Sequence, residues 1–364
     1  MYFCGMDIAE IAHVSLPENH IIKMLRNEAA KAESYGHLTP KQLAVIYKNK
    51  WFQLLVPKAI AGAECDLPTF CLFVEYLASI DGSLAWCINL GAGANMFAGY
   101  MNQDTAHSLF NDPVVCIAGS GAKTGTAQVL GSSYVINGTW RYASGAHHAT
   151  HFSLNARLGT EENAPYLSFV IPKEQVQIVQ AWDAFGLKAT SSHDFIINHG
   201  VVPKTYAFDL TKPPLHELGD LYRFPFPLLA QINILAVTTG LARRFLELSK
   251  EVYTSKHKGR SIHFDQVCDE LEAAFEERRQ QVYRKLNLLW MENKRQAIDE
   301  IKVSSTFTQT IVKAANASRA LVDGLFPYLG MQSILYSSEI NRVWRDFKVA
   351  SQHLLLRPGQ IFRD

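Results

Sequence analysis

The chain has 364 residues, of which 48% are hydrophobic and 19% are charged, a composition typical of a globular protein with a large core. Its 35 lysines and arginines nearly balance its 34 aspartates and glutamates, so the formal charge is +1, without the basic excess of a nucleic-acid-binding protein. Apolar runs stay short of the roughly 20 residues that span a bilayer, and the first residues lack the basic-then-apolar order of a signal peptide. We therefore expect a cytoplasmic protein with neither a nucleic-acid nor a membrane partner.

The cysteines and histidines argue against a disulfide frame or a metal site. The six cysteines are scattered and form no Cys-x-x-Cys pair, which is typical of reduced, buried thiols. His147, His148 and His151 lie close together, but on one strand His148 would point away from the other two, and no nearby carboxylate completes a ligand set. We expect no metal.

Residues 1–112 are predicted to form an N-terminal helical domain. The run LFVEYLASI at 72–80 has the periodicity of a helix, and shorter amphipathic segments precede it. Between them, Pro57, Gly62 and Pro68 interrupt regular structure.

Residues 113–222 differ in texture and are predicted to form a middle antiparallel β domain. Short β-rich runs such as VVCIAGS, THFSLNA and YLSFVI alternate with Gly, Asn, Asp and Ser. The pair Asn137-Gly138 predicts a hairpin turn between the segments around Val135 and Arg141, because both residues tolerate positive φ.

Residues 223–364 return to helical periodicity. Apolar residues recur every three or four positions in four long segments, which predicts a C-terminal four-helix bundle. The predicted fold class is thus α+β, in the order helices, β domain, helical bundle.

The segment that ends the predicted hairpin could hold a flat ring. In an extended strand Trp140, Tyr142 and Ser144 would share one face, and Gly145 would let the backbone approach a ligand closely. An aromatic wall with a hydroxyl donor suits a flavin, whose faces are apolar and whose edges are polar. Half-buried strands often carry the same residues, so this pattern alone leaves both interpretations open.

The wider sequence around this segment resembles the acyl-CoA dehydrogenase superfamily. The likeness is carried by YVINGTWRYASGAHHATHFSLNAR, by LASIDGSLAW at 77–86, by DAFGL at 183–187 and by RVWRD at 342–346, in the family's order. Matched along these motifs, Tyr142 falls on the family's flavin-stacking aromatic residue and Ser144 on the hydroxyl residue that hydrogen-bonds flavin N5. The resemblance implies further cofactor contacts at Gly145, Thr190, Ser191 and Ser192.

Two features place the likeness nearer the two-component, group D hydroxylase-like monooxygenases than the thioester dehydrogenases. The common dehydrogenase base is a Glu about nine residues after Arg345-Asp346, and no Glu follows Arg345 here. Leu354 stands at that position with His353 before it, and the resemblance implies that His353 lies over the flavin as the catalytic residue. A second histidine that several such monooxygenases carry is missing from residues 87–95, where Asn89 or Asn95 could line the substrate pocket. We also expect His148 to line the substrate pocket.

The resemblance implies FAD as cofactor, with FMN possible, a small-molecule substrate, a separate flavin reductase and a homotetramer. Two alternatives remain open at this point. One is an acyl-CoA dehydrogenase that takes its base from a bundle helix, and the other is a homologue that binds flavin or assembles without catalysis. The candidate bases for the first alternative are Glu270, Glu272, Glu276 and Glu277.

Overall fold

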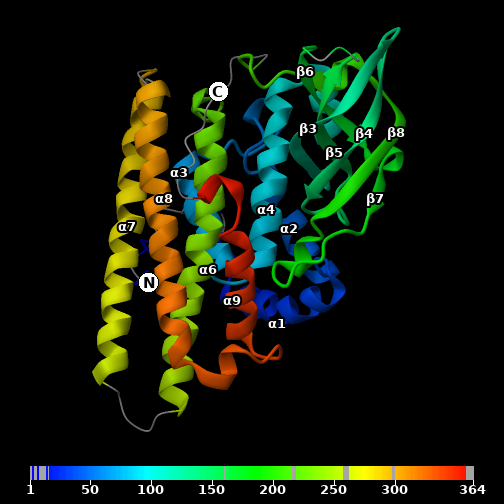
Figure 1. The fold of residues 1–364 in the computed structure, drawn as a ribbon. Coiled ribbons are helices and arrows are strands. Elements are labelled where there is room, and N and C mark those ends of the chain that lie inside the picture. The colour runs from blue at the N-terminus through cyan, green and yellow to red at the C-terminus, as the bar shows by residue number, and fades with distance from the viewer. Residues whose placement is uncertain are drawn as a thin grey trace.

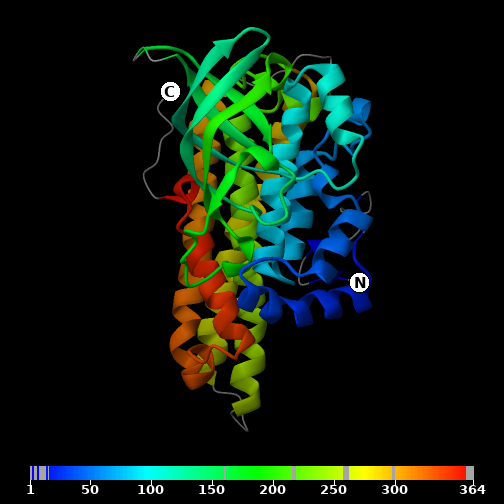
Figure 2. The same ribbon diagram turned by 90° about the vertical axis from the view of Figure 1, so that its right-hand side faces the viewer.

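The computed structural model describes residues 2–3, 6–7, 14, 16–159, 161, 163–214, 219–256, 262–296 and 300–357. Within them, helices, a sheet and further helices follow one another in the predicted order. In Figure 1, α4 and α6 stand between the sheet and the α7–α8 pair, and in Figure 2 the sheet faces the viewer with the N-terminal helices beside it.

Within its described residues, the N-terminal part contains two short antiparallel strands and five α-helices. Their bounds are β1 (Tyr2–Phe3), β2 (Met6–Asp7), α1 (Asn19–Tyr35), α2 (Pro40–Lys48), α3 (Leu67–Ala78), α4 (Gly82–Asn95) and α5 (Gln103–Phe110). Local signals set several helix starts: Thr39 forms a capping box with Gln42, and the side chains of Asp66 and Asp81 cap α3 and α4. Every residue of α3 is buried, so this helix is apolar all round and lies inside the core.

The middle part is a seven-stranded sheet in the order β7-β8-β4-β3-β5-β6-β9. The strands are β3 (Ile117–Leu130), β4 (Ser133–Ala143), β5 (His151–Leu158), β6 (Tyr166–Pro172), β7 (Gln177–Val179), β8 (His193–Pro203) and β9 (Ala207–Phe208). The sheet is mixed, which corrects the expectation of a purely antiparallel domain, because β3 and β5 pair in parallel. Residues 144–150 connect the end of β4 to β5, which pairs with the opposite side of β3. Ser144, directly after β4, therefore lies near the start of β3, at one end of these central strands.

The predicted hairpin turn at Asn137-Gly138 is wrong. Both residues lie inside β4, and the turn between β3 and β4 lies at Gly131, where Leu130 pairs with Ser133. Gly138 is needed for packing, since a Cβ there would come within 2.7 Å of the Gly125 Cα and 2.8 Å of the Trp140 ring.

The C-terminal part is a bundle of four helices. They are α6 (Phe226–Lys256), α7 (Ile262–Lys294), α8 (Glu300–Leu325) and α9 (Glu339–Ala350). Among the described residues, α6 alone is long and apolar enough to cross a membrane, but 83% of its most apolar window is buried inside the protein. It is the central helix of the bundle, in contact with α3, α8 and α9.

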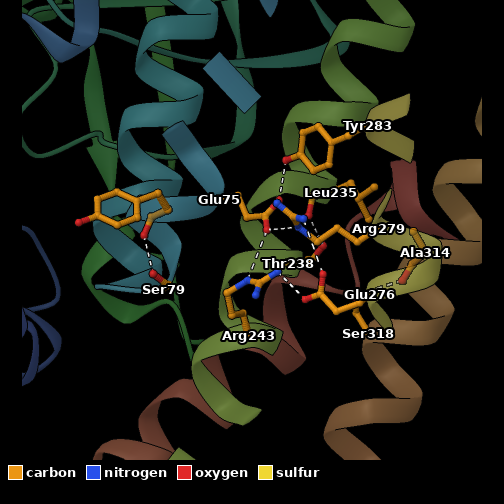
Figure 3. Close-up of polar contacts among 11 residues, drawn as sticks. Glu75, Ser79, Leu235, Thr238, Arg243, Glu276, Arg279, Tyr283, Ala314 and Ser318 are labelled. Carbon is orange, nitrogen blue, oxygen red and sulfur yellow. Dashed lines mark hydrogen bonds and ion pairs between the residues drawn. The ribbon is translucent and has the colours of Figure 1, made fainter. Parts of the chain in front are cut away.

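A buried ionic network joins α3, α6 and α7 (Figure 3). Glu75 is fully buried and accepts hydrogen bonds from Arg279 and Tyr283, each at 2.6 Å. Arg243 lies 3.7 Å from Glu75 and donates to Glu276 at 2.6 Å. Two arginines therefore face two carboxylates in the bundle interior, each charge close to an opposite one.

Candidate active site

A cavity of about 370 Å³ lies where α4, the edge of the sheet and α6 meet. Apolar and small residues form most of its wall, with Leu90 and Ala94 from α4, Phe97 from the 3-10 turn after α4, residues 117–121 from β3, and Phe226, Leu229 and Ile234 from α6. Ser144, Asn89 and His353, three of the residues predicted from the sequence, also line it. Further polar residues on the wall are Ser120, Ser153, Asn155, Ser168 and Asn233. Segments far apart in the sequence thus place a limited set of polar groups on a mainly apolar chamber, the usual form of a small-molecule site.

Ser144 belongs to a chain of hydroxyl groups that leads away from the cavity. Its Oγ accepts a hydrogen bond from Trp86 Nε1 at 3.0 Å and lies 2.7 Å from Ser192 Oγ. Ser192 Oγ is in turn 2.7 Å from Thr190 Oγ1, which donates to the Leu187 carbonyl at 2.7 Å. All three hydroxyl residues are buried. Thr190 and Ser192 therefore reach the cavity only through Ser144.

His353 follows the last bundle helix and meets the same tryptophan. Its ring lies 5.8 Å from the Trp86 ring, edge to face. Burial lowers the pKa of His353 to about 4, with Arg357 adding to the effect, so the imidazole is neutral at pH 7. Nδ1 accepts from the Leu355 amide at 3.3 Å, which leaves the proton on Nε2 as a donor.

Asn89 supplies an acceptor without a protein partner. Its Nδ2 donates to the Asn233 carbonyl at 3.3 Å, whereas its buried Oδ1 has no hydrogen-bond partner among the described residues. A buried acceptor without a hydrogen bond costs about 1–3 kcal/mol of folding free energy, so this oxygen favours a ligand or water that donates to it.

Tyr142 lies elsewhere, on the surface. Its backbone has a φ of +64°, which breaks the strand alternation, so the expectation that Trp140, Tyr142 and Ser144 share one face is wrong. Trp140 is fully buried in the sheet core, and Tyr142 is 64% exposed with its ring 6.2 Å from that of Trp182. The flavin-stacking role of Tyr142 stays a prediction for a surface residue.

Gly145 and His148 pack against each other beside the site rather than lining the cavity. Gly145 has a φ of +86°, and a Cβ there would lie 3.0 Å from His148 Nε2, so a larger residue would be strained and tightly packed. His148 stacks on Phe52 at 5.5 Å, and neither of its ring nitrogens has a partner among the described residues. Burial, with a smaller effect of Lys173, lowers its pKa to about 3.

Ser191 and Asn95 have structural partners and also lie off the cavity wall. The buried Ser191 ends a 3-10 turn in the left-handed region, with φ at +43°, and its Oγ accepts a hydrogen bond from the His147 amide at 3.4 Å. Asn95 uses its amide to tie α4 to the sheet: Nδ2 donates to the carbonyls of Phe52 and Val115, and Oδ1 accepts from the Ile117 amide.

The described residues place no carboxylate on the wall of the cavity. Among the described residues that line it there is no Asp, Glu, Lys or Arg. The four glutamates weighed as alternative bases lie on α7: Glu276 pairs with Arg243, Glu272 pairs with Lys250, and Glu270 and Glu277 are exposed. The described wall therefore offers no carboxylate base for removing a proton from a thioester.

Sequence reasoning did not single out Trp86 or Asn233 as site residues. Trp86 stood in a motif that marked the fold, and only the structure shows that it contacts both Ser144 and His353. Asn233 gave a local signal, since it is a polar residue between Ile232 and Ile234 in the mainly apolar first half of α6.

The donor and acceptor set of the cavity fits a flavin. A flavin ring needs apolar walls for its faces and hydrogen-bonding groups for its polar edge. The apolar side chains of α4 and α6 provide the walls, and Ser144, the unpartnered oxygen of Asn89 and the neutral His353 provide the polar groups.

Known proteins give the same assignment of family. Residues 232–358 match the family model "Acyl-CoA dehydrogenase, C-terminal domain". The chain is 26% identical to indole-3-acetate monooxygenase of Pseudomonas putida over 315 residues, 84% of this chain and 80% of the other. It is 23% identical to the flavin-dependent monooxygenase oxygenase subunit HsaA of Rhodococcus jostii (strain RHA1), covering 94% of both chains.

The fold agrees with a solved structure of the same kind. XiaF from Streptomyces sp., in complex with FADH2 and glycerol, superposes with a TM-score of 0.85 at 20% identity, covering 96% of this chain and 91% of that one. The resemblance inferred from the sequence motifs is confirmed. Residues 232–358 match the acyl-CoA dehydrogenase family, the fold of the chain is that of its solved neighbour XiaF, and the relatives that it resembles along most of its length are flavin-dependent monooxygenases.

Proposed function

We propose that this chain is the oxygenase component of a two-component monooxygenase, which receives reduced flavin from a separate reductase and oxygenates a small neutral organic substrate. When bound, reduced flavin supplies two electrons to O2, so that one oxygen atom enters the substrate, the other leaves as water and the flavin is oxidised. The words "oxygenase subunit" in the name of HsaA support a separate reductase.

The observation that carries this proposal is the composition of the cavity wall. Its polar members are a neutral histidine, serine hydroxyls and asparagine amides, with no Asp, Glu, Lys or Arg among its described residues. Dehydrogenation of a thioester needs a carboxylate base opposite the flavin, whereas oxygen chemistry needs a dry pocket with a hydrogen-bond donor. His353 supplies that donor through Nε2, and the apolar residues of α4 and α6 exclude water.

The same wall favours a neutral substrate. An anion in an apolar chamber without an arginine or lysine would lose its hydration without gaining an ionic partner. We therefore expect an uncharged substrate, with Phe97 and Phe226 available to pack on an aromatic ring. Indole and indole-3-acetate form a matched pair of probes, and we expect indole to bind more tightly.

FAD is the proposed flavin, and FMN is the alternative. The fold shared with XiaF, which binds FADH2, supports FAD. We also propose a homotetramer, because α7 leaves Ile262, Leu288 and Met291 exposed along the outer side of the bundle. Sedimentation of the full chain tests the assembly.

The decisive experiment is anaerobic titration of the purified chain with reduced FAD and reduced FMN, followed by mixing with air in the presence of indole. The proposal predicts tight binding of one reduced flavin and an oxygenated product in step with flavin oxidation. Bleaching of bound oxidised flavin by acyl-CoA thioesters without oxygen would instead identify a dehydrogenase. Failure of both flavins to bind in either redox state would leave a homologue without flavin catalysis.

A further inference from the structure

Ser144, Ser192 and Thr190 form a chain of hydroxyl groups that ends at the Leu187 carbonyl, and this carbonyl fixes the direction of each hydrogen bond in the chain. The Leu187 carbonyl can only accept, so Thr190 must give its single proton to it at 2.7 Å. Thr190 Oγ1 can then only accept from Ser192, and Ser192 Oγ can only accept from Ser144. Three protons fill three contacts, and any other assignment leaves two oxygens facing each other at 2.7 Å without a proton between them.

The near end of the chain completes the count for Ser144. A serine oxygen has one proton and two lone pairs. Its proton goes to Ser192, and one lone pair accepts from Trp86 Nε1 at 3.0 Å. One lone pair remains for the cavity that Ser144 lines. Toward a ligand, Ser144 is therefore an acceptor and not a donor.

This polarity separates the two redox states of a flavin. N5 of oxidised flavin has a lone pair and no hydrogen, whereas N5 of reduced flavin carries a hydrogen. A serine that can only accept makes a hydrogen bond with N5–H of the reduced ring. Beside the oxidised ring, its lone pair faces the lone pair of N5 and no hydrogen bond forms. Two groups with no proton between them lose the hydrogen bond and also the hydration that each had in water.

We propose that Ser192 and Thr190 are positioning residues that hold the Ser144 hydroxyl as an acceptor, so that the cavity binds reduced flavin in preference to oxidised flavin. The inference rests on the proposed function, since it needs the N5 edge of a flavin to meet Ser144. It adds that selection of the redox state is set by two residues that do not line the cavity. For a component that must take flavin from a reductase and release it after oxidation, this preference drives both transfers in the required direction.

Four variants test this hydroxyl chain, here called the relay, through the ratio of the dissociation constants of oxidised and reduced FAD. In Ser192→Ala the Ser144 proton loses its acceptor and is free to turn toward the cavity. In Thr190→Val the Ser192 proton loses its acceptor and can turn to Ser144, which again frees the Ser144 proton. Thr190→Ser keeps the hydroxyl and is the conservative rescue. Ser318→Ala removes a buried serine of α8 far along the chain and controls for a general loss of stability.

We expect the wild-type ratio of oxidised to reduced dissociation constants to exceed one, and to fall about tenfold in Ser192→Ala and Thr190→Val, mainly through tighter binding of oxidised FAD. Thr190→Ser and Ser318→Ala should keep the wild-type ratio. A purely structural role would weaken both redox states together and leave the ratio unchanged, which would overturn the relay. Loss of binding of both flavins by the wild-type chain would instead overturn the proposed function.

Discussion

The carboxylate of Asp346 accepts a hydrogen bond from the Leu187 amide at 2.5 Å, and the carbonyl of the same Leu187 ends the hydroxyl chain that starts at Ser144. Helix α9 thus holds the loop that orients the site. Arg345 donates to the Phe185 carbonyl at 2.7 Å, and a Cβ on Gly186 would lie 2.1 Å from the Arg345 carbonyl oxygen. Arg345 and Phe185 are 160 residues apart in the chain. The Arg-Asp motif at 345–346 and the Phe-Gly-Leu motif at 185–187 thus form one contact, which we call the clamp.

Asp346→Asn should make stability less sensitive to pH. Burial raises the pKa of Asp346 to about 7, with Asp81 and Glu33 adding to the effect, while an unfolded Asp titrates near 4. Between these values the folded state binds more protons than the unfolded state, so stability falls as pH rises through this window, by at most about 4 kcal/mol. Asparagine keeps the acceptor for Leu187 and cannot ionise. Subtracting the melting temperatures of the variant from those of the wild type between pH 4 and pH 8 isolates this effect.

The matched control for that measurement is Asp346→Ala. It removes the charge and also the acceptor, leaving the buried Leu187 amide without its partner. We expect a lower melting temperature at every pH and a loose 187–192 loop. Equal melting temperatures for the alanine and asparagine variants would contradict the clamp.

His148→Leu should flatten the acid side of the stability curve. Burial lowers the pKa of His148 to about 3, and an unfolded histidine titrates near 6.5. As pH falls through this window the unfolded state takes up a proton that the folded state does not, so the wild type loses stability. Leucine fills a similar volume beside Phe52 without polar atoms. Melting temperatures of the two proteins should diverge in favour of the variant below pH 6.

His148→Gln separates the two parts of that argument. Glutamine cannot take up the proton, so its curve should be as flat as that of the leucine variant, but its amide would be buried without partners at a cost of about 1–3 kcal/mol. A glutamine variant as stable as the leucine variant would show that this pocket admits water or a partner for the side chain.

The order of the parts followed from the sequence because periodicity is a local property. The helical stripes of α6 to α9 and the β-rich runs of β3 to β6 appear within windows of ten to twenty residues. The failures were also local in origin. The alternation expected at Tyr142 fails because this residue takes a left-handed conformation, and the Asn137-Gly138 pair serves packing under the Trp140 ring instead of a turn.

The site was harder to predict because contacts between distant segments decide it. Ser144 and His353 could be named from motifs, yet their link through Trp86 depends on how α4 packs between the sheet and the bundle. Asn89 and Asn95 looked equivalent in the sequence. They differ because the side chain of Asn95 is fully used by backbone groups, whereas the oxygen of Asn89 is left without a partner among the described residues.

Glu75→Gln should destabilise the bundle by about 3 kcal/mol or more, because removing one partner leaves buried charge unpaired. The change takes the carboxylate away from Arg279 and Arg243 inside the network of Figure 3. Thermal unfolding of the full chain measures the loss. In the double variant Glu75→Leu/Arg279→Leu no charge is stranded at this pair, so it should recover part of the stability. A double variant less stable than Glu75→Gln would contradict the account.

His353→Ala should uncouple flavin oxidation from substrate oxygenation. The variant loses the Nε2 donor on the cavity wall but keeps the Ser144 contacts, so the affinity for reduced flavin should stay within about threefold. The rate of product formation should fall about 100-fold, with H2O2 released in place of product. Product and H2O2 are measured together after mixing the reduced complex with air.

Two controls make the assignment of His353 specific. Leu354→Ala changes an exposed neighbour that does not line the cavity, and it should keep wild-type coupling. The pH profile is the second control. Because burial lowers the pKa of His353 to about 4, the imidazole stays neutral from pH 5.5 upward, and the product yield should show no step near 6.5. A step near 6.5 that disappears in His353→Ala would mean that this histidine acts as a proton donor in its charged form, which would replace the neutral donor assigned to it.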